Sequence, residues 1–343
     1  MIGPLLSRLL DPAALGPTTV RGLFDRLVDP STVEPERTAL LVALAARAPS
    51  AAELALFARE MRRRARPFPV PPEDRPVDLC GSGGAPRPSY NVSTVSALVV
   101  AAAGTPVVKH GNRSFRGPCG SSDLLEALGL PVTSSLALPT ETYRAARIAF
   151  LHAPLHHPAT AAVRVARSTI GIPTIFNRLG PLSNPARVPF QVVGSQDPFL
   201  AGLFARALPA LGVRRGITLS SAEGCDEFSP RRPTSAHLWG MGGSERRTIR
   251  PEGLLEASER RGPWGPLPPE PAAREAERLL AGGSGARRGS ILLTSGAALW
   301  VAGAAPNLGG GVALARRTLD GGAALDLLER LRTVARSLES GAP

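Results

Sequence analysis

The chain has 343 residues, of which 43% are hydrophobic, so it is long enough to bury a large core and is not an intrinsically disordered protein. Its formal net charge of +12 comes from 40 Lys and Arg side chains, and all but one are arginines spread along the sequence, which argues against a dedicated nucleic-acid surface. The three scattered cysteines exclude a disulfide framework and a zinc site.

The first segment is predicted to be helical. Two stretches place apolar residues on one face at the 3.6-residue period. They are Ile2, Leu5, Leu6, Leu9 and Leu10, and then Val20, Leu23, Phe24, Leu27 and Val28. Ser50 and Glu53 form a capping box that opens a third helix. The early apolar runs are short and interrupted by Arg8, so they form neither a signal peptide nor a membrane span, and we expect a cytoplasmic protein.

A proline-rich stretch over 67–72 ends this helical part, because proline cannot continue a helix and stiffens a linker. We therefore predict a helical N-terminal domain over 1–70 and a larger α/β domain over 71–343. Some helices near 168–190 are expected to pack with the helical domain.

From Val77 onward, short apolar runs alternate with amphipathic segments, which predicts an α/β fold with a largely parallel central sheet. The predicted strands are Val77–Cys80, Pro106–Val108, Ile148–His152, Gln191–Gly194 and Gly216–Leu219. The glycine- and proline-rich stretch 259–290 is predicted to be a long surface connection. Helices are expected around Ala297–Ala302, Gly311–Thr318 and Ala323–Leu338.

A glycine-rich loop, Gly81–Gly84, follows the first predicted strand, and Asn91–Thr94 then opens an alanine- and valine-rich helix. Backbone amides of a glycine loop and of a helix N-terminus converge on anions, so a phosphate-bearing ligand is a natural occupant. A tight turn without a ligand would also use glycine. The carboxyl ends of parallel strands are where ligands bind in such sheets.

The next predicted strand delivers Lys109, the only lysine in the chain, beside His110, Asn112 and Arg113. Where arginine serves everywhere else, a lysine indicates that a compact point charge is needed. Together with the glycine loop, it indicates a site for a phosphate-bearing ligand. The Asp226–Glu227 pair, taken alone, is most simply a solvated turn, although an isolated acidic pair at a strand end also suits magnesium.

The run from Gly81 to Gly129 resembles the signature of the anthranilate phosphoribosyltransferase family in the order and spacing of its glycine loop, its Asn-x-Ser-Thr turn and its Lys-His-Gly-Asn-Arg element. The resemblance covers nearly the whole chain. It continues through Phe150–Pro154, His157–Pro158, Thr174–Asn177, Leu179–Leu182, Asn184–Pro185 and Gly224–Glu227.

The resemblance implies a fold of the nucleoside phosphorylase and phosphoribosyltransferase class, and a homodimeric enzyme of tryptophan biosynthesis. Such an enzyme moves the phosphoribosyl group of 5-phosphoribosyl 1-diphosphate onto the amine of anthranilate and releases diphosphate. By motif, the donor-binding residues would be Gly81, Ser82, Gly84, Ser89, Asn91, Val92, Ser93, Thr94, Lys109 and Ser121. Ser93, Asp226 and Glu227 would hold Mg²⁺.

The resemblance also implies an anthranilate site of Gly81, His110, Asn112 and Arg167, with His157 as a candidate pocket wall. Lys109 and Arg167 would be the catalytic residues. Arg167 is chemically suited, since a guanidinium group pairs with a carboxylate through two parallel hydrogen bonds.

The sequence departs from the family pattern at four places. Ala85 stands where the family has an aspartate after the glycine loop, and Arg116–Cys119 replaces a serine-rich loop. Pro173 stands where an arginine is typical, and Leu293–Ala297 lacks an expected asparagine. These changes concern the diphosphate side more than the acceptor side.

Three functions remain open from sequence. The first is anthranilate phosphoribosyl transfer. The second is transfer or phosphorolysis with another acceptor in the same fold. The third is a non-catalytic paralogue that binds nucleic acid through its basic surface, which salt-dependent retention on nucleic acid would detect. Of these we expect the first, with small-molecule substrates, no membrane partner and no nucleic acid.

Overall fold

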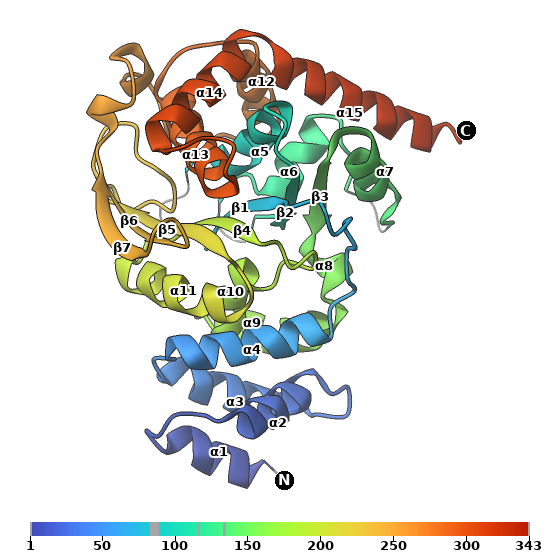
Figure 1. Ribbon diagram of the computed structural model, residues 1–343. Helices are drawn as coiled ribbons and strands as arrows, with labels where there is room; N and C mark the ends of the chain where they lie inside the picture. Colours follow the sequence, from blue (N-terminus) through green and yellow to red (C-terminus); the bar gives the residue numbers. More distant parts are fainter. Residues whose placement is uncertain (1, 83–88, 115–116, 133–134, 342–343) are drawn as a thin grey trace.

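The structure is a computed structural model and describes residues 2–82, 89–114, 117–132 and 135–341. Helices α1 to α4, at the lower end of the molecule in Figure 1, span Gly3–Leu10, Pro17–Val28, Glu34–Ala46 and Ala51–Arg63. The predicted capping box of α4 is confirmed, because the Ser50 side chain accepts from the Glu53 amide at 3.1 Å while Glu53 Oε2 accepts from the Ser50 amide at 2.7 Å.

A seven-stranded sheet forms the centre of the molecule, with strands in the order β3-β2-β1-β4-β5-β6-β7. The strands are β1 Val77–Gly81, β2 Val107–Gly111, β3 Ile148–His152, β4 Phe190–Gly194, β5 Arg215–Ser221, β6 Thr234–Trp239 and β7 Ser244–Ile249. The first five pair in parallel, and they are the five strands that the sequence predicted. Their carboxyl ends therefore lie at one edge of the sheet.

The last two strands pair antiparallel and were not predicted. β7 contains Glu245, Arg246 and Arg247, all exposed. Charged side chains on a solvent-facing edge strand prevent pairing with another chain, and they also remove the apolar alternation by which a strand is recognised.

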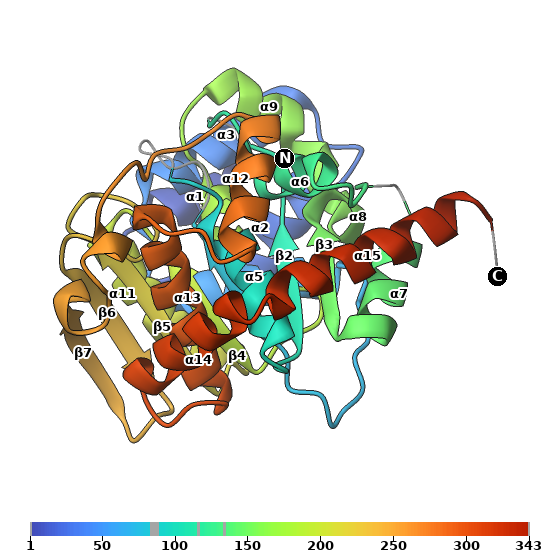
Figure 2. The same cartoon turned by 90° about the horizontal axis from the view of Figure 1, so that it is seen from above.

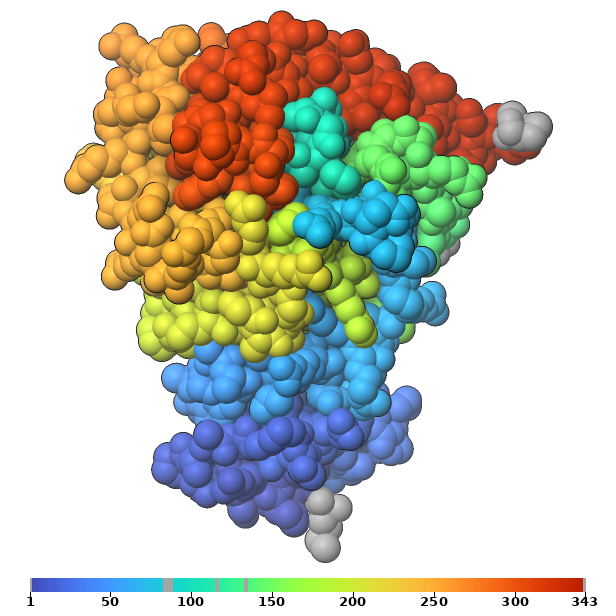
Figure 3. All heavy atoms as spheres, in the orientation of Figure 1, coloured from blue at the N-terminus to red at the C-terminus, as the bar shows by residue number. Residues whose placement is uncertain are grey.

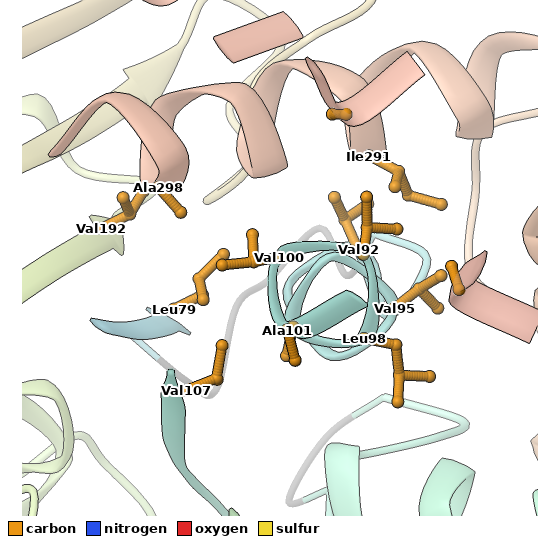
Figure 4. Close-up of a cluster of buried hydrophobic side chains, with 14 of the residues drawn as sticks. Leu79, Val92, Val95, Leu98, Val100, Ala101, Val107, Val192, Ile291 and Ala298 are labelled. Carbon is orange, nitrogen blue, oxygen red and sulfur yellow. The ribbon is translucent and has the colours of Figure 1, made fainter. Parts of the chain in front are cut away.

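The helices between β1 and β5 cover both faces of the sheet. They are α5 Val92–Ala102, α6 Ser121–Ala127, α7 Ala137–Ala146, α8 Ala153–His156, α9 Arg164–Ile170, α10 Ile175–Leu179 and α11 Pro198–Ala210, with short 3-10 turns at Pro158–Val163 and Gly180–Leu182. α5 is buried almost all round, and Figure 4 shows its side chains pointing toward Leu79 and Val107 of the sheet and toward Ile291 of α13. An all-apolar helix suits that central position.

The prediction of a surface connection over 259–290 was wrong. α12 spans Pro269–Leu280 and α13 spans Ala286–Ala302, and both bury apolar residues in the main core. Ala272, Ala276 and Leu279 recur at the helical period, and prolines at the start of α12 need no amide hydrogen bond there. α14 Leu308–Asp320 and α15 Ala323–Glu339 complete the upper layer, where α15 lies against α5 and α7 (Figure 2).

The apolar interior forms two large clusters. One lies between the sheet and the upper helices α5 and α12 to α15. The other joins the N-terminal helices to α9, α10 and α11 beneath the sheet, so the lower end of the molecule in Figure 3 is continuous with the layer above it. Among the described residues, no helix is both long and apolar enough to cross a membrane.

Candidate active site

The carboxyl ends of β1 and β2 meet the loop after β5 at one edge of the sheet. β1 ends at Gly81 and β2 at Gly111, while β5 leads into the turn that carries Asp226 and Glu227. A methyl group at Gly81 would overlap Asp226 Oδ2, and one at Gly194 would overlap the Asp226 carbonyl. Glycine is thus required at 194, where the Asp226 backbone lies against the strand end, whereas a methyl group at 81 would force the Asp226 side chain to shift.

Lys109 lies at the centre of this edge. Its side chain is only 3% exposed, and Nζ donates to the Leu79 carbonyl at 2.6 Å and to Ser93 Oγ at 3.1 Å. Within the described residues no carboxylate forms an ion pair with it. A lysine ammonium has three N–H donors, so one remains for a ligand. The structure therefore places a buried cation beside the first turn of α5.

Asp226 and Glu227 lie near the Lys109 ammonium and form part of the same polar cluster. Glu227 Oε1 accepts from the Ser93 amide at 3.3 Å. Burial raises the pKa of Asp226, and burial together with the Asp226 charge raises the pKa of Glu227 well above its usual range, although Lys109 opposes both shifts. Glu227 is buried and Asp226 half-buried, and two adjacent carboxylates that resist ionisation would gain most from a bound cation.

The start of α5 supplies further donors. Asn91 caps the helix, and its side-chain amide donates to the Cys119 carbonyl at 3.2 Å. Thr94 is fully buried, and Oγ1 has no hydrogen-bond partner in the described part of the chain. Ser82 and Ser89 are half-buried on either side of the 83–88 gap, and Val92 is the first residue of α5. Gly84 and Ala85 lie outside the described residues.

Ser121 opens α6 beside β2. Its hydroxyl donates to the Asn112 carbonyl and accepts from the Asn112 amide, both at 3.0 Å. Behind it lies a cavity of about 40 Å³, which Lys109, Gly111 and Ser121 line at one end. The rest of its wall is mostly apolar and comes from α6, α7 and β3. Arg116 of the loop before α6 lies outside the described residues.

On the opposite face of β2, His110 packs against His157, which follows α8. His110 and His157 are 7% and 2% exposed, and their ring centroids are 5.0 Å apart in an edge-to-face arrangement. Burial and the neighbouring His157 lower the pKa of His110 well below its usual value, and burial lowers the pKa of His157 to about 4 although the nearby Ser183 carbonyl opposes the shift. Both rings are therefore neutral at neutral pH and form an uncharged wall.

Arg167 on α9 is half-buried, and its side chain contacts Asn177 and Phe176. Nη2 donates to Asn177 Oδ1 at 3.4 Å, and the guanidinium carbon lies 5.8 Å from the centre of the Phe176 ring. Burial lowers the pKa of Arg167. No hydrogen bond joins it to Asn112, whose side chain is exposed and accepts from the Arg113 amide. In the described structure, hydrogen bonds thus connect Lys109, Ser93 and Glu227, but none connects Arg167 with Asn112.

Two of the sequence departures can be placed. Pro173 is exposed and precedes Thr174, which caps α10 in a capping box with Asn177. Leu293–Ala297 lies in the middle of α13, where the Thr294 and Ser295 hydroxyls are buried without partners in the described part of the chain. Neither segment forms a hydrogen bond with Lys109 or Ser93 in the described part of the chain.

A buried polar group next to the site was missed from sequence. Asp78, Asn184 and Gln191 are fully buried, and both amide side chains donate to the Asp78 carboxylate. The available signal was a carboxylate between Val77 and Leu79 in an otherwise apolar strand. A buried charge of this kind needs nearby donors.

Comparison with known proteins places this chain among glycosyl transferases. Residues 73–325 match the family described as "Glycosyl transferase family, a/b domain". Curated relatives include anthranilate phosphoribosyltransferases of Thermomicrobium roseum, 35% identical over 98% of each chain, and of Synechococcus sp. (strain JA-3-3Ab), 40% identical over 95% of each.

Solved structures agree with these relatives. The anthranilate phosphoribosyltransferase of Thermus thermophilus superposes with a TM-score of 0.87 at 34% identity, covering 97% of this chain and 99% of that one. The Saccharomyces cerevisiae enzyme in complex with PRPP and Mg superposes with a TM-score of 0.83 at 23% identity over 97% of each chain, a likeness that concerns the fold.

Proposed function

The chain belongs to the glycosyl transferase family that contains the anthranilate phosphoribosyltransferases, and from this premise we propose how its own residues transfer a phosphoribosyl group to anthranilate. The anthranilate nitrogen forms a bond to C1 of phosphoribosyl diphosphate, and the bond from C1 to the diphosphate oxygen breaks. Its electrons leave with diphosphate, and the amine loses one proton. The reaction belongs to tryptophan biosynthesis.

The donor site is proposed at the edge where Lys109, Ser93 and the start of α5 meet. The convergence of a buried cation, an orphaned Thr94 hydroxyl and a helix N-terminus supports this placement. Positive charge there favours the departing diphosphate, on which negative charge develops as the bond to C1 breaks. The remaining donors are Gly81, Ser82, Ser89, Asn91, Val92 and Ser121, and Gly84 is proposed with them from its motif.

Ser93, Asp226 and Glu227 are proposed to hold Mg²⁺. The residues fit such an ion, because two adjacent carboxylates with raised pKa values lie beside Ser93, whose amide donates to Glu227 Oε1. No group of three acidic, histidine or cysteine side chains with metal-site geometry occurs in the described residues. Magnesium commonly uses one or two carboxylates and completes its shell with substrate phosphates. The ion would supply neutralisation of the diphosphate charge.

The acceptor is proposed to bind between the histidine wall and Arg167. A guanidinium group pairs with the carboxylate of anthranilate, and the neutral His110 and His157 rings offer an apolar surface for its aromatic ring. Asn112 and Gly81 are proposed to complete the site. With pKa values this low, the histidines are poor bases, so orienting the amine rather than removing its proton is their proposed role.

The assembly and its location are also proposed. A groove between α1, α3 and α9 is lined mainly by apolar residues, and Leu10, Val42 and Val165 on it are 78%, 45% and 57% exposed. An apolar surface of this kind fits a second copy of the chain, as a homodimer requires. The three cysteines all lie in the described part of the chain and form no disulfide there, which supports work in the reducing cytoplasm. The division at residue 70 remains a proposal.

The deciding experiment measures fluorescent phosphoribosyl anthranilate formed from anthranilate and phosphoribosyl diphosphate while Mg²⁺ is titrated. Wild type is compared with Lys109→Ala and Arg167→Ala, and Arg164→Ala, an exposed arginine on the same helix, is the matched control. We expect product from wild type and from the control, and a loss of about 100-fold or more in each site variant. No product from folded wild type at any magnesium level would overturn the proposal and direct the search to another acceptor.

A further inference from the structure

Asp78 lies beneath the sheet, on the face opposite α5. Leu79 points toward α5 in Figure 4, and successive side chains of a strand point to opposite faces, so Asp78 points away from that helix. Its carboxylate is fully buried. Oδ1 accepts from the His110 amide at 3.3 Å, and Oδ2 accepts from Asn184 Nδ2 at 2.9 Å and from Gln191 Nε2 at 3.3 Å.

The two amide side chains extend this contact to the main chain. Asn184 Nδ2 also donates to the Val108 carbonyl at 2.8 Å, and Gln191 Nε2 also donates to the Pro181 carbonyl at 2.6 Å. One carboxylate therefore connects β1, β2 and β4 to the segment over 180–184. Removing it would leave several of these buried donors without their acceptor.

The segment over 180–184 supports the His110 side of the proposed anthranilate site, and we call the His110 and His157 rings together with this segment the acceptor wall. It directly follows α10, whose Asn177 binds Arg167, and the Gly180 carbonyl lies against the His110 ring. On its other side, Arg62 of α4 donates to the Leu182 carbonyl at 2.7 Å. The wall is thus fixed to the helical layer by Arg62 and to the sheet by Asp78.

We propose that Asp78 is a positioning residue that sets the acceptor wall against the phosphoribosyl side of the site. This inference rests on the proposed function. A buried carboxylate costs free energy that an apolar residue would not, so packing alone does not account for it. A carboxylate accepts hydrogen bonds on both oxygens and so satisfies all three donors. An asparagine at this position would point its own N–H groups at one of these donors.

The test replaces Asp78 with asparagine, which keeps the size of the side chain. We expect kcat/KM for anthranilate to fall by about 10-fold to 100-fold, because small displacements of an orienting wall have effects of this size. The KM for phosphoribosyl diphosphate should change by less than about 3-fold, since Lys109 and Ser93 are held on the other face of the sheet.

Glu259→Gln is the matched control. Glu259 is a second buried carboxylate, 3% exposed, and its partners are Arg288 and Arg316 of the upper helices. It should lower the melting temperature without altering either KM. If Asp78→Asn only lowers the melting temperature, or raises both KM values alike, Asp78 is merely structural and the proposal is wrong.

A binding experiment separates this outcome from failure of the transfer reaction itself. Quenching of anthranilate fluorescence reports the acceptor site, and calorimetric titration of diphosphate with Mg²⁺ reports the donor site. We expect Asp78→Asn to weaken anthranilate binding about 10-fold and to leave diphosphate binding within about 3-fold of wild type. Equal weakening of both ligands would overturn the positioning role even if no turnover were measurable.

Discussion

At the scale of single residues, the site depends on the close approach of the Asp226 turn to two glycines at strand ends. The turn carrying Asp226 lies so close to the ends of β1 and β4 that neither Gly81 nor Gly194 has room for a methyl group. The position of the acidic pair relative to Lys109 is therefore set by backbone contact as well as by charge.

Gly194→Ala should displace the Asp226 turn and weaken the proposed magnesium site. Overpacking of this kind costs about 1–3 kcal/mol, and here the turn is the part that can move. We expect the magnesium concentration for half-maximal product formation to rise about 10-fold or more. Gly265→Ala is the control, because no atom lies within 4 Å of its added methyl group. An unchanged magnesium requirement in Gly194→Ala would contradict this account.

As the pH is lowered, Mg²⁺ affinity should begin to fall at a higher pH than it would at carboxylates with ordinary pKa values. Burial raises the pKa of Asp226, and burial with the Asp226 charge raises the pKa of Glu227, so without metal these groups stay protonated to a higher pH than the usual value of about 4. Mg²⁺ must displace those protons, and affinity is lost as pH falls through the raised pKa values. Calorimetry of Mg²⁺ binding in buffers of different ionisation enthalpy should show proton release near these values. Asp226→Asn should reduce that release.

At the scale of elements, the sequence predicted those whose pattern is local. The five parallel strands follow from short apolar runs, and α4 follows from its capping box. β7 was missed because its side chains are exposed and charged. α12 was missed because the prolines at its start are typical of a loop and its helical pattern is short. Boundaries and partners depend on tertiary packing, which local pattern does not contain.

The site divides in the same way. The glycine loop, Lys109 and the start of α5 lie at strand and helix ends that pattern can locate, and the structure brings Lys109 to Ser93. The Asp226–Glu227 pair was assigned by resemblance, because a surface turn has the same composition. The bonds of Asp78 to Asn184 and Gln191 join residues far apart in the chain, so no local signal predicts them.

Ser50→Ala should destabilise the protein through α4. The substitution removes the hydroxyl that satisfies the Glu53 amide, and losses of N-caps cost about 1 kcal/mol. We expect the urea midpoint to decrease at unchanged m-value. Ser337→Ala, at an exposed position of α15, should change stability by less than about 0.5 kcal/mol. Equal effects of the two variants would show that the cap contributes nothing specific.

At the scale of the whole molecule, the apolar groove between α1, α3 and α9 lies at the end of the protein opposite the upper helices (Figure 1). The active-site edge is built from the sheet and from α5, so association through the groove would leave the donor side of the site uncovered. Dimer formation and donor binding should therefore be separable by substitution.

Val42→Glu should convert the proposed dimer to a monomer. A carboxylate at the centre of an apolar interface loses its hydration without gaining a partner. Sedimentation velocity should show a single slower species, while diphosphate binding stays within about 3-fold of wild type. Phe199→Glu on α11, which is 63% exposed and does not line the groove, is the control and should leave the association state unchanged. A sedimentation coefficient for Val42→Glu equal to that of the wild type would refute this interface.

The close contact of the Asp226 turn with Gly81 and Gly194 also means that the donor site forms late in folding. The donor edge joins residues 81, 93, 109 and 227, and the acidic turn reaches them only after β4 has paired with β1 and β5 with β4. Contacts so distant in sequence form slowly, because chain entropy opposes them until the intervening segments are in place. A chain still on the ribosome cannot bind its substrate until residue 227 has emerged. In refolding, capture of the metal and diphosphate should therefore lag behind the return of helical signal.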